Sequence, residues 1–140
     1  MAIFYAHKSN NDAFEKFLNC LVEANQVWAK NAQLLIFSVG AKNYKFNSKP
    51  NNYYMHDVGA ANAYLVLQVA ELRFQAHQMA GFDIVKTIST FNIDSENYSP
   101  ITFIAVGYQG DAESLPENLR NAELQPRTRK ENNLFITKIT

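Results

Sequence analysis

The stretch that decides the fold runs from His56 to Asp83 and reads HDVGAANAYLVLQVAELRFQAHQMAGFD. Residues 56–75 contain no proline, and apolar side chains occupy nearly every side of the helix that this pattern predicts. A helix that is apolar almost all round must be buried, and a chain of 140 residues offers little protein to cover it. We therefore expect a homodimer, in which a second copy of the chain supplies the missing cover.

The residues that follow this helix form a turn before the next one. Gly81 permits a tight backbone, and Asp83 can cap a helix that runs to about Phe91. At Met79, Ala80 and Gly81 the backbone N–H groups are accessible, a geometry suited to hydrogen-bonding a flat heteroaromatic ring. A tight strand-to-helix turn without a ligand would have the same sequence, so both interpretations stand.

Strands and helices alternate along the rest of the chain, which indicates an α+β fold. The expected strands are Ile3–Ala6, Leu34–Val39, Ile101–Tyr108 and the tail Leu134–Thr137, and the other expected helices are Ala13–Glu23 and Asn25–Lys30. Between them, Ala41–Tyr54 is rich in Asn, Lys and Tyr and is expected to be an exposed loop with a function.

Composition excludes several classes of protein. The 13 basic and 13 acidic residues balance, so the chain lacks the broad positive field that nucleic-acid binding needs. Neither a signal peptide nor a membrane-spanning apolar run is present, which favours a cytoplasmic protein. The single Cys20 lies on the apolar face of a helix and is expected to be a buried structural thiol.

Common catalytic and metal-binding motifs are missing from the sequence. It has no Gly-x-Ser-x-Gly elbow, phosphate-binding Walker loop, Cys-x-x-Cys pair or His-Glu-x-x-His, and its three histidines lack the spacing of metal ligands. We therefore assign no catalytic side chain and no metal site.

Arg127 and Arg129 follow Pro126, which favours an extended backbone. In an extended chain residues i and i+2 point to the same side, so the two guanidinium groups can converge on one dianion such as a phosphate. A solvated basic tail is the alternative.

Six short motifs, taken in order, make the chain resemble the nitroreductase family of FMN-dependent oxidoreductases. They are Asn25-x-x-Trp28-Ala29, Leu34-Leu35-Ile36, Asp57-x-Gly59-Ala60-Ala61, His77-Gln78-Met79-Ala80-Gly81-Phe82-Asp83, Ala105-x-Gly107-Tyr108 and Pro126-Arg127-Thr128-Arg129-Lys130. No single motif is decisive, but their order and spacing match along essentially the whole chain.

The resemblance implies a single domain over residues 1–140, with a central mixed β-sheet flanked by helices. It also implies an obligate homodimer that buries the long helix and exchanges a C-terminal strand with its partner. Met79, Ala80 and Gly81 would lie against the FMN isoalloxazine, with a backbone N–H near its N5 atom. Arg127 and Arg129 would hold the FMN phosphate.

The activity that the resemblance implies is electron transfer from NAD(P)H through FMN to a nitroaromatic, a quinone or a similar small acceptor. The loop 41–54 would border the substrate opening.

The chain departs from the family pattern at three places. Ala80-Gly81 stands where the family has Gly-Gly, Gln33 replaces a common proline, and Met1 falls just before the first strand. The usual N-terminal section with its Arg-x-Ser-x-Arg motif is therefore expected to be missing, and FMN to bind weakly. The alternative is that the chain is a shortened, flavin-poor dimer that acts as a binding or structural module without catalytic turnover.

Overall fold

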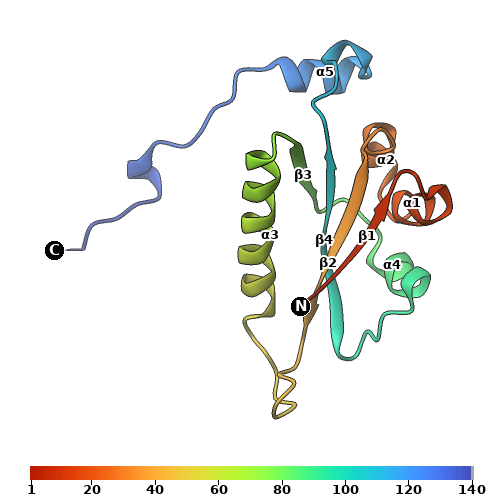
Figure 1. Ribbon diagram of the computed structural model, residues 1–140. Coiled ribbons are helices and arrows are strands. Elements are labelled where there is room, and N and C mark those ends of the chain that lie inside the picture. Colours follow the sequence, from red (N-terminus) through yellow and green to blue (C-terminus); the bar gives the residue numbers. More distant parts are fainter. Residues whose placement is uncertain (140) are drawn as a thin grey trace. The chain divides into compact units, whose positions relative to one another are not determined.

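The computed structural model describes residues 1–139 and consists of two units, with the boundary between Gln109 and Gly110. The first unit contains β1 (Ala2–His7), α1 (Asn11–Leu18), α2 (Glu23–Ala29), β2 (Leu34–Ala41), α3 (Tyr54–Glu71), β3 (Gln75–Met79), α4 (Ile84–Phe91) and β4 (Tyr98–Gly107) (Figure 1). The α+β class is confirmed. That residues 1–140 form a single domain stays a prediction, because the two units are described separately.

The four strands form one sheet in the order β1-β2-β4-β3, and every neighbouring pair is antiparallel. The sequence analysis expected a mixed sheet, and the lengths of the connections explain the difference. A parallel neighbour requires a connection that returns along the strand. The eight residues of β2 extend about 27 Å, whereas the seven or eight residues of α1, α2 and α4 each rise only about 12 Å or less.

Only α3 is long enough to return along the sheet. Its 18 residues rise about 27 Å, and it connects β2 to β3, which point in the same direction with β4 between them. The long helix therefore determines the order of the strands.

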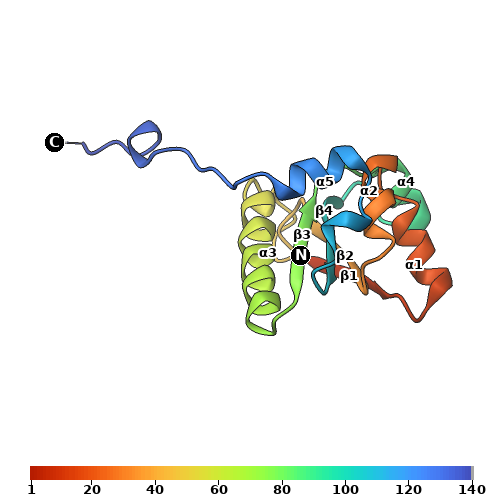
Figure 2. The same ribbon diagram turned by 90° about the horizontal axis from the view of Figure 1, so that it is seen from above.

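Helices α1, α2 and α4 cover one face of the sheet, and α3 lies on the other (Figure 2). The first face contains the larger core, in which the Phe37 ring stacks between those of Phe4 and Phe103, with centroids 4.7 and 5.1 Å away. Cys20 lies in this core with 0% exposure, which confirms the expected buried thiol.

The opposite face is smaller. Ile36, Ile104 and Val106 pack there against half-buried side chains that include Leu65 and Val69 of α3. The burial of α3 is one-sided, because only Val58 and Asn62 in it are buried. The sequence analysis expected cover on all sides, which this chain alone does not give.

Helix α3 ends four residues earlier than the expected His56–Gln75. Arg73 adopts a left-handed backbone with φ of 63°, its N–H bonds to Ala70 O (2.9 Å), and the next N–H, of Phe74, bonds to Val69 O (3.0 Å). This pair of bonds is a Schellman motif, which ends a helix. Glycine usually occupies the left-handed position, so arginine there concealed both the end of α3 and the start of β3.

The helix expected over Ala13–Glu23 also ends early. Asn10 caps α1 by accepting from Ala13 N (3.2 Å), and the chain leaves the helix after Leu18. Leu21 then forms an isolated antiparallel bridge with Phe82, so a tertiary contact interrupts the helical pattern before α2 begins.

The second unit contains a 3₁₀ turn at Ala112–Ser114, α5 at Glu117–Leu124 and a second 3₁₀ turn at Asn132–Leu134. The strand expected over Leu134–Thr137 is not formed within residues 1–139. Phe135 and Ile136 instead bond back to Asn132 O and are 63% and 59% exposed. A strand needs a neighbour, so its exchange with a partner stays a prediction. Within residues 1–139, no helix has both the length and the apolar character required to span a membrane.

Candidate functional site

The turn after β3 is held by the segment that connects α1 to α2. The Gly81 carbonyl accepts two hydrogen bonds, from Val22 N (3.1 Å) and from Asn25 Nδ2 (3.0 Å). Two residues further on, Asp83 N donates to Cys20 O (2.8 Å). We call Cys20, Val22 and Asn25 the clasp.

Gly81 is required by the closeness of the clasp. A Cβ atom at this position would lie 2.6 Å from Asn25 Nδ2 and 2.9 Å from Val22 Cγ2, both shorter than real contacts. Sequence reasoning included Asn25 in the family resemblance but missed its contact with Gly81, because 56 residues separate the two positions.

The hydrogen bonds of the turn leave its donors free and its acceptors occupied. The carbonyls of Met79, Ala80 and Gly81 all accept, from Thr102 Oγ1 (2.9 Å), from Phe82 N (3.0 Å) and from the clasp. By contrast, the N–H groups of Ala80 and Gly81 donate to no atom of residues 1–139. The turn therefore offers two backbone donors to an external acceptor.

The side chains of the turn differ in exposure. Met79 is 2% exposed and packs in the core against the α1, α2 and α4 face, so any ligand contact it makes is through its backbone. Ala80 is exposed and Gly81 is half-buried, so the two free donors are flanked by the smallest side chains.

Arg127 and Arg129 are exposed and lie in the second unit, where residues 126–131 have no regular secondary structure. Arg129 Nη1 donates to the Thr128 carbonyl (2.9 Å). Neither arginine forms an ion pair within residues 1–139. That they converge on a phosphate beside the turn stays a prediction.

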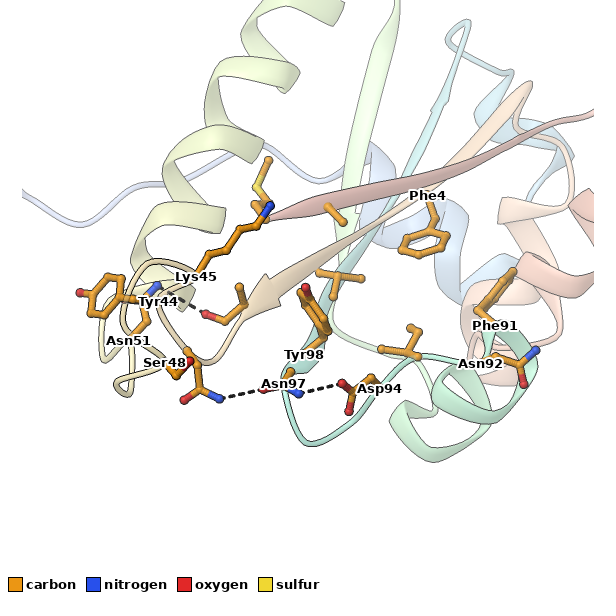
Figure 3. A pocket seen from close by; sticks show the side chains of 16 residues that line it. Phe4, Tyr44, Lys45, Ser48, Asn51, Phe91, Asn92, Asp94, Asn97 and Tyr98 are labelled. Carbon is orange, nitrogen blue, oxygen red and sulfur yellow. Dashed lines mark hydrogen bonds between the residues drawn. The ribbon is translucent and has the colours of Figure 1, made fainter.

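The loop 41–54 lines a pocket of about 920 Å³, together with the start of β1 and the segment 91–98 (Figure 3). Phe4 and Phe91 form its apolar side. On the polar side Asn43 Nδ2 donates to Asn97 Oδ1 (3.0 Å), and Asn97 Nδ2 donates to Asp94 Oδ2 (2.8 Å). This last bond lowers the pKa of Asp94 below its ordinary value. That the loop borders the substrate opening stays a prediction.

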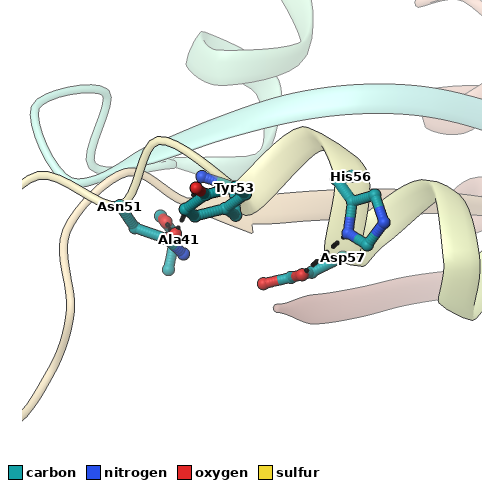
Figure 4. Close-up of polar contacts among 5 residues, drawn as sticks. All are labelled: Ala41, Asn51, Tyr53, His56 and Asp57. Carbon is teal, nitrogen blue, oxygen red and sulfur yellow. Dashed lines mark hydrogen bonds and ion pairs between the residues drawn. The ribbon is translucent and has the colours of Figure 1, made fainter.

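Polar contacts lie where this loop leaves β2 and where it leads into α3 (Figure 4). Asn51 donates to Ala41 O (3.4 Å) and accepts from Tyr53 N (3.0 Å), while His56 and Asp57 form an exposed pair at 3.2 Å. In residues 1–139 no three His, Cys, Asp or Glu side chains are grouped as metal ligands would be.

Trp28 and His77, two further residues of the resemblance, are in contact. The ring of Trp28 in α2 meets that of His77 in β3 edge-on, with centroids 5.0 Å apart. This contact attaches α2 to the strand that carries the turn, which gives His77 a packing role.

Comparison with known proteins identifies the family. The model of the Nitroreductase family matches residues 5–108, from β1 to just past β4, and the chain belongs to this family. Among curated proteins, none matches the chain.

Three solved structures illustrate the similarity. One, described as an oxidoreductase containing FMN, is 28% identical with a TM-score of 0.85, over 96% of this chain and 69% of that chain. A putative NAD(P)H:FMN oxidoreductase from Staphylococcus epidermidis is 10% identical, with a TM-score of 0.77 over 99% of this chain and 75% of its own. CLA-ER, an enone reductase of gut-bacterial fatty acid saturation metabolism, is 16% identical, with a TM-score of 0.75 over 99% and 77%. The last two share the fold.

Proposed function

We propose that the chain is an FMN-dependent oxidoreductase that takes electrons from NAD(P)H and passes them to a nitroaromatic, a quinone or a similar small acceptor in the cytoplasm. The observation that carries this proposal is the pair of free backbone donors at Ala80 and Gly81. Family membership and the 28% identical FMN-containing oxidoreductase support it. Bound FMN would supply the hydride chemistry at N5 of its ring.

The turn fits the acceptor atom of an oxidised flavin. N5 then has a lone pair, so it needs an N–H donor and would be repelled by a carbonyl oxygen. At this turn all three carbonyls are occupied within the chain and the two N–H groups are free. Because only backbone atoms take part, Ala80 can replace the glycine that the family pattern has at this position.

The two arginines would hold the phosphate of the same cofactor. Guanidinium groups form paired, charge-assisted hydrogen bonds with phosphate oxygens. Arg127 and Arg129 are both exposed and form no ion pair within residues 1–139, so no carboxylate there competes for them.

The outer face of α3 supports a homodimer. Tyr64 and Leu67 are 74% and 65% exposed in the single chain, and the neighbouring Ala60 and Ala63 are also exposed and small. Such a face allows a second helix to pack closely and would bury apolar side chains that are otherwise in water. Leu67→Glu would place an unpaired charge in this interface, and the cost of burying it should dissociate the dimer.

The oligomeric state tests the dimer proposal. Val85, on α4, is 77% exposed, so Val85→Glu is a matched apolar-to-charge control outside α3. We expect light scattering to show dimers for the wild type and Val85→Glu, and monomers for Leu67→Glu. A wild type that is monomeric and well folded would refute the dimer.

Absorption and titration test the cofactor. We expect titration of the purified protein with FMN to shift the flavin absorption spectrum until the site is saturated, and the bound flavin to bleach on anaerobic addition of NADH or NADPH. If the chain dimerises but binds no FMN, this result would instead favour the alternative of a binding or structural module without catalytic turnover.

A further inference from the structure

Thr102 on β4 lies beside the turn and donates a hydrogen bond to one of its peptide groups. Its Oγ1 is 2.9 Å from the Met79 carbonyl oxygen and 3.3 Å from that of Phe103. A hydroxyl has one proton to donate, and the shorter contact takes it. The carbonyl of Met79, whose residue pairs with Phe103 in the β3–β4 ladder, therefore also accepts a hydrogen bond from a side chain of the neighbouring strand.

The same peptide group carries the N–H of Ala80. The peptide bonds of residues 1–139 are all trans, so this N–H points away from the Met79 carbonyl. Fixing the carbonyl thus fixes the direction of the free donor. A hydrogen bond accepted by a carbonyl also polarises its peptide group and makes the N–H a stronger donor.

We propose that Thr102 is a positioning residue, whose hydroxyl orients and polarises the Met79–Ala80 peptide so that the Ala80 N–H is ready to donate to the ring nitrogen of a bound flavin. This inference rests on the proposed function and adds a residue to it. Thr102 acts through the peptide and need not touch the cofactor.

The surroundings of Thr102 keep it in place. Thr102 pairs with Ser38 of β2, whose hydroxyl donates to the Thr102 carbonyl in a long contact of 3.5 Å. Ser38 Oγ in turn accepts from Asn62 Nδ2 of α3 (3.0 Å), and both of these side chains are at most 1% exposed. A β-branched residue such as threonine also has few χ1 rotamers, which limits the directions its hydroxyl can take.

The proposal predicts an effect that depends on the redox state of the ligand. Oxidised N5 accepts a hydrogen bond, whereas reduced N5 carries its own hydrogen and has no need of the donor. Thr102→Val, which removes the hydroxyl at nearly constant volume, should weaken binding of oxidised FMN about threefold to tenfold, which corresponds to one hydrogen bond. Binding of reduced FMN should stay unchanged, and Thr102→Ser should restore the wild-type values.

A second measurement needs no cofactor. In the FMN-free protein, loss of the hydrogen bond to the Met79 carbonyl should move the amide nitrogen resonance of Ala80 upfield in Thr102→Val, and Thr102→Ser should reverse the shift. If Thr102→Val does not fold, Thr102→Ala takes its place with the same expected shift.

The outcomes separate this proposal from the proposed function. An Ala80 resonance that does not respond to loss of the hydroxyl, or equal weakening of oxidised and reduced FMN, would overturn the role of Thr102. If the wild type binds no FMN, the proposed function fails. The Ala80 resonance alone then decides whether Thr102 orients and polarises the Met79–Ala80 peptide.

Discussion

Replacing Arg73 with glycine should make the protein more stable. Arg73 occupies the left-handed position of the Schellman motif that ends α3, with φ of 63°. Its side chain is exposed and makes no hydrogen bond or ion pair within residues 1–139. The substitution therefore removes backbone strain without removing a contact.

The expected magnitude is the difference between two backbone effects. A side chain in the left-handed helical region costs about 1–2 kcal/mol, because Cβ crowds the following carbonyl oxygen. Glycine also gives the unfolded chain more conformational freedom, which reduces the gain in stability by about 0.4–1 kcal/mol. The net gain for Arg73→Gly is about 1 kcal/mol, or a rise in Tm of about 2–4 °C for a chain of this size.

Urea unfolding measures this gain as a higher midpoint at an unchanged slope. All variants are compared at one protein concentration, since dimerisation would make stability depend on it. Arg73→Ala is the matched control: it shortens the side chain but keeps Cβ, so its stability should stay close to that of the wild type. Equal gains from glycine and alanine, or a loss with glycine, would refute the explanation by backbone strain.

Two further predictions concern the turn and its cofactor. Replacing both Arg127 and Arg129 with alanine should weaken FMN binding at least tenfold, since each charged hydrogen bond is worth about 1.5–3 kcal/mol, and should leave riboflavin binding unchanged because riboflavin has no phosphate. Fluorescence titrations with both ligands measure this, and an equal loss for both would show that the arginines act through folding. Gly81→Ala should destabilise the protein by about 1–3 kcal/mol in urea unfolding, because its Cβ would overlap the clasp. Gly110→Ala, where a Cβ meets nothing within 4 Å, should be nearly neutral, and equal effects at the two glycines would contradict the overlap.

Local sequence signals located most of the first unit. The largely apolar runs at 34–39 and 101–108 correctly predicted strands β2 (Leu34–Ala41) and β4 (Tyr98–Gly107), and Asp83 caps α4 as expected, accepting from Lys86 N (2.9 Å). Such elements are determined by side chains near one another in the chain, so periodicity and capping residues reveal them.

The errors occur where distant contacts or backbone strain outweigh local preference. Leu21 was expected in a helix but forms a bridge with Phe82 instead. Arg73 adopts a left-handed backbone conformation that is normally expected only of glycine. Strand β3 was not predicted, because its residues Gln75, His77 and Gln78 do not give the alternation of apolar and polar side chains that is typical of a strand.

The candidate site was predictable only in part, for the same reason. Ala80 and Gly81 could be chosen from their small size, and Met79 together with them from the family resemblance. The direction of their hydrogen bonds could not, because it depends on Asn25 and Thr102, which reach the turn from other elements.

The burial of Cys20 gives the turn a built-in reporter. Its thiol is the only one in the sequence and is 0% exposed, while its carbonyl holds Asp83 beside the turn. A buried thiol meets a reagent in water only when the surrounding structure opens. The rate at which Cys20 is modified therefore measures how often the clasp separates from the turn, and a cofactor that stabilises the closed turn slows that rate.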